Sequence, residues 1–475
     1  MSTPNEAERP GEKAERTTEA AAPQPTRRRI VEWLRALWNR PVDEATKRRL
    51  ATAQRLLEGV AVGLVVALLA TTLPAALDDP DDLEKGTVVV LSGRDDSIDG
   101  QRGKLIEQWN ALHPETQALI VELPEIADAQ RSEMLARAQA GGGGVDVYNL
   151  DVTWTAEFAA AGHLQSLDES RVRTGDFLPG PLSTCRYDDR LWALPFNTDV
   201  GLLYYNTELL TKVERTESPS SWGRLIDDAE EIAGISHGAT AGYVGQFADY
   251  EGLTVTALEM VWGAEGVVVD DEGTVLPDSR DVAAVRTAFG RLKTVARTLP
   301  PTNEATSIEE FRNGRALYMR NWPLADRTLR DAELGPVIPF GVATLPGGSA
   351  ALGGQNLAVS ATTDMPKASR ALVEFLTDAR SQQQLFQRGG LPATRRIVYK
   401  DPAVQSDFTT TLVDALDGAR TRPVVPHYAA FSRAFRAEVD AYVRPRSTRP
   451  RRGHPRPAGG RAAGPRTAAT ELRPF

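Results

Sequence analysis

The sequence predicts an α/β protein with more than one folding unit, preceded by one transmembrane helix. Three observations predict this class: the 475 residues exceed one compact core, strand-like and helix-like runs alternate from residue 86 onward, and one apolar run has the length of a bilayer. One cysteine, Cys185, excludes an intramolecular disulfide framework and multi-cysteine zinc sites. The histidines never fall at the spacing of a helical metal site, so we expect neither a metal nor another cofactor.

Charge is distributed unevenly along the chain. Residues 1–55 carry a net charge of +4, residues 444–475 carry +8, and the stretch between them carries −21, which gives the overall −9. A strongly acidic body repels phosphate groups, so nucleic-acid binding by the folded part is not expected.

The first element is the apolar run 56–77, whose only charge is Glu58 near one end. At about 1.5 Å per residue this run matches the roughly 30 Å hydrocarbon core of a bilayer, which predicts a transmembrane anchor. Basic residues precede the run and four aspartates follow it within residues 78–82, so we expect a single-pass cell-membrane protein with a cytoplasmic N-terminus and an extracytoplasmic body. A cleaved signal peptide is the alternative, but the 55 preceding residues and the segment TLPAALDD disfavour cleavage.

Residues 1–55 are therefore expected to be cytoplasmic and mostly disordered, because residues 1–26 are rich in Glu, Ala, Thr and Pro. Apolar residues between 30 and 40 repeat at helical spacing, with arginines on the other side. This pattern predicts a short amphipathic helix that lies on the inner membrane surface or packs on a partner. Residues 78–85 are expected to form a linker.

The exported body begins with strand-like runs at 87–93, 117–124 and 145–151, separated by helical runs around 104–112 and 127–140. Ligands of open α/β sheets lie beyond the carboxyl ends of the strands, where Asp151 and Trp154 follow the third run. Asp151 would contact a ligand or cap the next helix, and Trp154 would face the site or pack on that helix.

The next candidates interrupt a long apolar run, residues 190–206. The polar residues Asn197, Thr198 and Asp199 within it need partners if the strand is buried. They form either a surface turn or part of a crevice that binds a ligand, and we favour the crevice.

Five blocks of the sequence resemble, in the same order, the extracellular solute-binding proteins of carbohydrate ABC importers, of the maltose and trehalose type. The blocks are LDVTWTAEFAAAGHLQSLD, LWALPFNTDVGLLYYN, GYVGQFADYEGLTVTALEMVWG, FRNGRALYMRNWP and ALGGQNLAVS. The resemblance covers about residues 86–440. It implies two α/β lobes of the periplasmic-binding-protein kind that are joined by hinge segments and close on a sugar. Lobe one would comprise 86–198 with 341–390, and lobe two 199–340 with 391–443.

The resemblance also implies the remaining site residues. Trp322 is expected to stack on a sugar ring, or to be a core tryptophan, and Gln246 is expected to supply polar groups. Glu251 starts a helix, where it would contact the ligand or favour the helix dipole. Arg422 would donate to sugar hydroxyls and pair with a cleft acid such as Glu251 or Asp199, or tie helices together at the surface.

The segment ALGGQN supplies three further candidates. Gly353 and Gly354 lack side chains, so backbone amides there would approach a ligand closely. Relatives often carry an aromatic residue at the position of Gln355, so this departure bears on which sugar is bound. A second departure is the basic tail, 444–475, which predicts disorder and either attraction to anionic lipids or a frame error in the gene record.

These features predict a monomeric, membrane-anchored receptor that captures a disaccharide or small oligosaccharide and delivers it to an ABC permease, without catalysis. An extracytoplasmic sugar sensor that signals through the anchor would share the same cleft. A glycoside hydrolase with Asp151 and Glu251 as acid and base is the enzyme alternative. No nucleophile motif or cofactor loop supports the enzyme alternative.

Overall fold

A computed structural model describes residues 83–444, apart from 142, 239, 271–273, 277, 297–300 and 336, together with the single residues Glu32, Arg35, Val60, Ala61 and Leu64. The chain divides into two units, residues 1–82 and 83–475. Nearly all of the predicted cytoplasmic stretch and anchor, and the whole tail from 445, lie outside the described residues. Within the described part of the chain, no helix combines the length and the apolar composition needed to cross a membrane.

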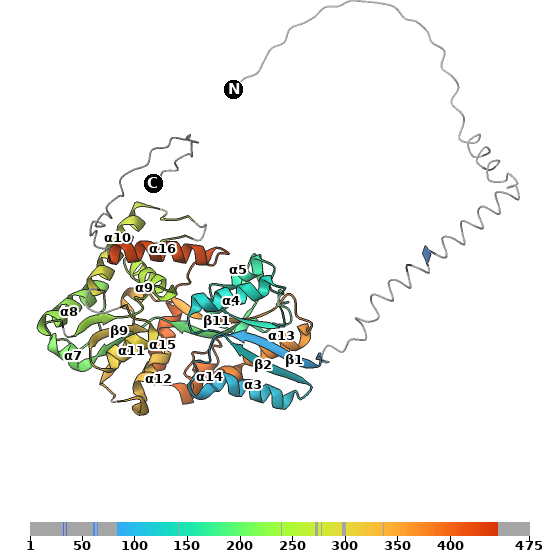
Figure 1. Ribbon diagram of the computed structural model, residues 1–475, viewed down its shortest axis with the longest axis horizontal. Helices are drawn as coiled ribbons and strands as arrows, with labels where there is room; N and C mark the ends of the chain where they lie inside the picture. Colours follow the sequence, from blue (N-terminus) through green and yellow to red (C-terminus); the bar gives the residue numbers. More distant parts are fainter. Residues whose placement is uncertain are drawn as a thin grey trace, which may run out of the picture. The chain divides into compact units, whose positions relative to one another are not determined.

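Lobe one is built on a five-stranded sheet with the strand order β2-β1-β3-β11-β6 (Figure 1). The strands are β1 (Gly86–Ser92), β2 (Thr116–Glu122), β3 (Val147–Asp151), β6 (Leu194–Val200) and β11 (Leu352–Val359). Strands β1, β2 and β3 are parallel, and β11 runs antiparallel to both β3 and β6. The carboxyl ends of β1, β3 and β6 and the start of β11 therefore meet at one edge of the sheet. The helices of this lobe are α3 (Gln101–Leu112), α4 (Ala127–Gln139), α5 (Thr155–Ala160), α6 (Pro179–Ser183), α13 (Pro366–Leu376) and α14 (Ala379–Gly389), with a small hairpin of β4 (Arg186–Tyr187) and β5 (Arg190–Leu191).

Lobe two is built on a four-stranded sheet with the order β10-β7-β9-β8. Its strands are β7 (Leu202–Asn206), β8 (Ala241–Val244), β9 (Ala316–Asn321) and β10 (Phe340–Thr344). Its helices are α7 (Thr207–Lys212), α8 (Trp222–Ile235), α9 (Glu251–Trp262), α10 (Ser279–Val295), α11 (Glu304–Arg312), α12 (Leu324–Arg330), α15 (Asp407–Asp417) and α16 (Tyr428–Val443).

Each lobe has its own hydrophobic core, so the predicted α/β fold with two lobes is confirmed. Helix α9 lies at the centre of lobe two, and every residue from Gly252 to Trp262 is buried. Helix α10 begins with a capping box, in which Asp278 and Asp281 each accept from the other's backbone amide. This local signal fixes where α10 begins.

Two crossings of the chain between the sheets lie side by side. Gly201 joins β6 to β7, and residues 345–351 join β10 to β11. The Gly201 amide donates to the Ala351 carbonyl at 3.3 Å, so these two crossings touch. Arg420, which follows α15, lies beside them, because it forms a bridge with Ala351 and its carbonyl accepts from the Leu352 amide at 2.9 Å.

The crossings are held by a buried ion pair. The Arg320 guanidinium contacts both carboxylate oxygens of Glu259 at 2.7 and 2.9 Å, and neither side chain is more than 1% exposed. Glu259 also accepts the Ala351 amide at 3.0 Å. A β-carbon on Gly201 would lie 2.3 Å from a Glu259 carboxylate oxygen, so this crossing requires glycine.

The strand pairing places the crossings a few residues from the predicted lobe boundaries at 198 and 340. Strand β6 continues in the first sheet to Val200, and residues 341–344 pair with β7 in the second sheet. The difference arises because β10 is an edge strand of lobe two before the chain turns back into lobe one.

Candidate functional site

Polar side chains form a row across one face of the lobe-one sheet, at the edge where β1, β3 and β6 end. Gln355 in β11 pairs with Asp151 in β3 on one side and with Asn197 in β6 on the other. Directly paired residues of antiparallel strands point to the same face, as do residues two apart in a strand. Asn149 and Asp199 therefore share this face with the row. The structure thus brings together four of the predicted residues, Asp151, Asn197, Asp199 and Gln355.

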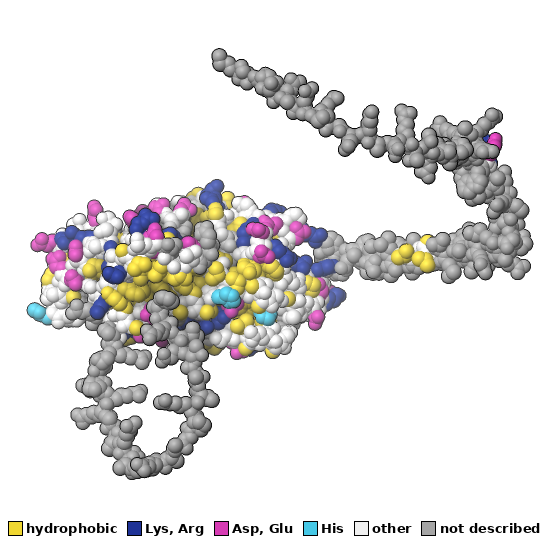
Figure 2. Space-filling model, turned by 90° about the horizontal axis from the view of Figure 1, so that it is seen from above, with side chains coloured by type: hydrophobic (Ala, Val, Ile, Leu, Met, Phe, Trp, Pro, Cys, Tyr) yellow, Lys and Arg dark blue, Asp and Glu magenta, His cyan; other side chains and the backbone are white. Residues whose placement is uncertain are grey.

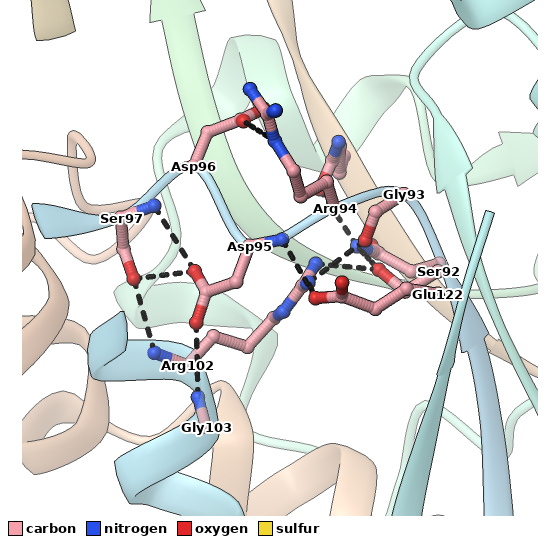
Figure 3. Close-up of polar contacts among 11 residues, drawn as sticks. Ser92, Gly93, Arg94, Asp95, Asp96, Ser97, Arg102, Gly103 and Glu122 are labelled. Carbon is pink, nitrogen blue, oxygen red and sulfur yellow. Dashed lines mark hydrogen bonds and ion pairs between the residues drawn. The ribbon is translucent and has the colours of Figure 1, made fainter. Parts of the chain in front are cut away.

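A buried network holds the Gln355 amide in place. The Asn149 side-chain amide donates to the Gln355 carbonyl oxygen at 2.7 Å and to the Ser92 hydroxyl at 2.8 Å. Ser92 also accepts from the Arg102 guanidinium at 2.6 Å (Figure 3). Gln355 is therefore fixed by a chain of contacts that runs back into lobe one.

The loop between β1 and α3 lies at the same edge and was not predicted as part of the site. The Asp95 carboxylate accepts from the Ser97 amide and the Gly103 amide, at 3.0 and 3.1 Å, and the Asp95 amide donates to Glu122 at 3.0 Å (Figure 3). These bonds fix the loop to α3 and to the end of β2. Ligands of open α/β sheets lie beyond the carboxyl ends of the strands, and this rule selected Asp151 after β3. It could also have selected this loop after β1, because β1 and β3 are neighbours.

Arg422 joins an acid of each lobe. Its guanidinium donates to Glu251, at the start of α9, at 2.7 Å and to Asp151, at the end of β3, at 3.2 Å. Its side chain is 2% exposed. Burial alone lowers the pKa of Arg422, but the charges of Asp151, Tyr428 and Glu251 outweigh burial and raise it. The structure thus shows the predicted pairing with Glu251, and Asp151 takes the place of the predicted partner Asp199.

The Glu251 carboxylate is saturated with donors. Besides Arg422, it accepts from the Tyr428 hydroxyl and from the Ser432 hydroxyl, the latter at 2.6 Å. Both come from α16, so Glu251 ties α9, α16 and Arg422 together. Tyr428 and Ser432 were missed from the sequence because a helix face alone does not show what it contacts.

Trp322 follows β9 and lies over the edge of the lobe-one sheet. The Arg320 guanidinium stacks on one face of its ring, 3.8 Å from the ring centre. The indole nitrogen donates to Glu304 at 3.3 Å, and Glu304 also accepts from the Tyr250 hydroxyl at 2.6 Å. The ring is partly buried and packs against the hydrophobic core of lobe two, and its stacking on a sugar ring stays a prediction.

The two glycines of β11 make room for other protein atoms. A β-carbon on Gly353 would lie 3.0 Å from the Trp322 ring and 3.1 Å from the Asp199 side chain. Gly354 has a φ of +120°, and its β-carbon would lie 2.3 Å from the Asn197 carbonyl oxygen. The missing side chains thus make room for the Trp322 ring and for the Asn197 backbone carbonyl, and a contact of the two glycine amides with a ligand stays a prediction.

Gln246 also differs from its prediction. It is 0% exposed, its carbonyl oxygen accepts from Arg320 at 3.0 Å, and its amide donates to the Arg320 carbonyl at 3.3 Å. It supports Arg320 from within the core of lobe two, because a buried guanidinium needs more acceptors than one carboxylate provides.

Asp199 has a strongly perturbed environment. Burial raises the pKa of its carboxyl to about 7; the Arg320 guanidinium opposes this rise and the charge of Asp151 adds to it. Among the described residues, its one side-chain hydrogen bond comes from the Asn197 amide at 3.3 Å. The side-chain carbonyl oxygen of Asn197, on the same face of β6, is buried without a partner in the described part of the chain. An unpartnered polar atom beside this carboxyl indicates a place where a hydroxyl group binds.

A pocket of about 210 Å³ lies beside the Arg422 cluster, between α4 of lobe one and α16 of lobe two. Trp154, which is 7% exposed, and Glu251 line it together. Among the described residues, no group of three or more His, Cys, Asp and Glu side chains is arranged to hold a metal ion.

Comparison with known proteins identifies the family. The model of the bacterial extracellular solute-binding proteins matches residues 120–410, more than half of the chain. The chain belongs to this family. A probable ABC transporter-binding protein of Deinococcus radiodurans is 32% identical to this solute-binding protein over 350 residues, which are 69% of this chain and 82% of the relative. The maltotriose-binding protein of Pyrococcus abyssi is 26% identical over 250 residues, 51% of this chain and 49% of its own.

Solved structures agree with this assignment. Maltose-bound MalE3 of T. maritima has a TM-score of 0.66 and 29% identity, covering 75% of this chain and 94% of its own. The GacH receptor of Streptomyces glaucescens, solved unliganded and with acarbose, has a TM-score of 0.65 and 27% identity, covering 76% and 93%. The protein is therefore an extracytoplasmic solute-binding protein of an ABC importer, a receptor and not an enzyme.

Proposed function

We propose that this solute-binding protein captures a disaccharide or small oligosaccharide between its lobes and delivers it to an ABC permease, while a single N-terminal helix anchors it in the cell membrane. The observation that carries the proposal is the row Asp151–Gln355–Asn197 on lobe one, opposite Trp322 and Arg422 of lobe two. A sugar presents hydroxyl groups that need paired donors and acceptors, together with an apolar ring face.

The relatives support a sugar as the solute. The Pyrococcus abyssi relative is named for maltotriose, and the T. maritima structure contains maltose. In this chain we assign the ligand contacts to residues at the facing edges of the two sheets: Asp151, Trp154, Asn197, Asp199, Glu251, Trp322, Gly353, Gly354, Gln355 and Arg422. Within this set, Glu251 acts through Arg422, and Gly353 acts by admitting the Trp322 ring.

Capture requires no bond making. The open form admits the sugar, and contacts available from both lobes only in the closed form shift the population toward closure. Arg422 is suited to this role because its guanidinium reaches an acid in each lobe. The same pairing argues against the hydrolase alternative, since Asp151 and Glu251 are both bound to one arginine rather than separated as acid and base.

The proposal is tested by a thermal shift series on the full chain in detergent with maltose, maltotriose, trehalose and cellobiose. A sugar at a hundred times its dissociation constant should add about 2.7 kcal/mol to the free energy of unfolding. Trp322→Ala should weaken binding of that sugar by about 1 kcal/mol or more, through loss of ring stacking. Trp192→Ala, a partly exposed indole elsewhere in lobe one, is the matched control. If neither these sugars nor further ones raise the melting temperature of the wild-type protein, a sugar is not its solute.

A further inference from the structure

The lobes are also joined by an ion pair outside the proposed ligand contacts. Arg436 of α16 donates to Asp128 of α4 at 3.1 Å. Helix α16 packs on α9 and α10 of lobe two, whereas α4 packs on β3 of lobe one. We refer to the pair Asp128–Arg436 as the latch.

The latch has one pre-positioned side chain, Arg436, and one more exposed side chain, Asp128. The Arg436 side chain is only 10% exposed, and Asp249 of lobe two holds it from behind at 2.8 Å. Asp128 is 46% exposed and has no other ion-pair partner in the described part of the chain. Because Arg436 is already oriented by its own lobe, pairing with Asp128 costs little side-chain entropy and depends mainly on how close the lobes are.

The position of the latch explains what it would control. The 210 Å³ pocket lies between α4 and α16, with Asp128 and Arg436 among its lining residues and Glu251 on its inner side. Figure 2 shows that this face of the molecule carries interspersed acidic and basic side chains beside a band of hydrophobic ones. The latch therefore bridges the two lobes one layer outside the Arg422 cluster.

We propose that Asp128 and Arg436 set the affinity of this protein by stabilising the closed form, without touching the solute. A contact of this kind changes the fraction of molecules that is competent to retain ligand, so it scales every apparent dissociation constant by one common factor. Its loss acts mainly on the dissociation rate. The affinity measurements that test this inference rest on the proposed sugar-binding function. The measurement of the distance between the unliganded lobes does not.

The first test measures the affinity and dissociation rate of the full-length protein for maltose, maltotriose and trehalose in the wild type, Asp128→Asn, Arg436→Gln and the double variant. Each single variant should weaken every sugar that binds by the same factor, about two- to fivefold, and the double variant should be no weaker than the worse single one. The factor should shrink in 1 M salt. Arg286→Gln in α10, an exposed arginine without a partner among the described residues, should leave affinity unchanged.

The latch would be overturned if the loss of affinity differed from sugar to sugar, or if the effects of the single variants added in the double variant. Arg436 would then contact the ligand itself or play no part in binding. The second readout needs no ligand. Spin labels at Leu119→Cys in lobe one and Ile235→Cys in lobe two, both exposed positions, report the distance between lobes, and the native Cys185 is buried. Arg436→Gln should shift the unliganded distances toward the open form, and an unchanged distribution would refute the latch even if no sugar bound.

Discussion

The pKa of Asp199 reflects the opposing effects of burial and of nearby charges in the candidate site. Its carboxyl lies beside the Arg320 guanidinium, yet burial next to Trp322 and Gly353 outweighs that charge and raises its pKa to about 7. A neutral carboxyl can donate a hydrogen bond as well as accept one. Near neutral pH this side chain is therefore able either to donate a hydrogen bond to a ligand hydroxyl or to accept one from it.

The raised pKa of Asp199 predicts a pH dependence of stability. Between about pH 4 and 7 the folded state binds more protons at this site than the unfolded state, so stability should fall as pH rises, by at most about 1.4 kcal/mol per unit. The carboxyl keeps partial exposure, so the slope should be smaller than this limit. Urea unfolding at pH 5, 6, 7 and 8 should show this slope removed in Asp199→Asn. The exposed control Asp364→Asn should behave as the wild type; equal slopes in all three proteins would contradict the assignment.

At the scale of elements, β11 determines the shape of the site. It lies between β3 and β6, contributes Gln355 to the polar row, and through Gly353 admits the Trp322 ring from the other lobe. The bulge between Gln355 and Asn356 re-aims the strand immediately after this row.

We expect Gly354→Ala to destabilise the protein by at least about 2 kcal/mol, because φ is +120° and the new β-carbon would lie 2.3 Å from the Asn197 carbonyl oxygen. Gly180→Ala in α6 meets only ordinary contacts, the nearest at 3.6 Å, and should be neutral or slightly stabilising. Chemical denaturation measures both. Equal stability of the two variants would show that β11 relaxes around the added methyl group.

The buried pair Arg320–Glu259 should matter far more than a pair on the surface. Glu259→Gln leaves a guanidinium that is 0% exposed without its charge partner, so it should cost about 3–5 kcal/mol. Glu310→Gln breaks the half-exposed pair with Arg315 and should cost less than about 1 kcal/mol. The measurement is the free energy of unfolding; comparable losses would mean that the crossings do not depend on Glu259.

Several elements could be predicted from the sequence because their signals are local. Strand-like runs indicated β1, β2 and β3, and the rule that ligands lie beyond the carboxyl ends of the strands selected Asp151 for the candidate site. The burial of Gln246 could not be predicted for a physical reason: whether a polar residue meets ligand or protein depends on which distant side chain fills the space, and Arg320 fills it here. The Trp322 ring above Gly353 could not be predicted for the same reason.

At the scale of the whole molecule, we propose that the apolar run 56–77 anchors the chain in the membrane. We expect the full chain to fractionate with membranes. Protease added to spheroplasts should remove the body after residue 83 and spare a tag at the N-terminus, because basic residues precede the apolar run 56–77. Deleting residues 1–82 should release the body into the medium or periplasm when an unrelated signal peptide exports it. An N-terminal tag digested together with the body would reverse the orientation.

Both lobes are assembled from separated stretches of chain, and this has a consequence for biogenesis. Strand β11 inserts between β3 and β6, yet it is synthesised about 150 residues after β6 begins. Until residue 359 has emerged, β3 can pair only with β1, and β6 is separated from the rest of the lobe-one sheet by the place that β11 will take. We therefore expect the nascent chain to remain translocation-competent through most of its synthesis, since the last strand that would commit it to a folded state arrives late.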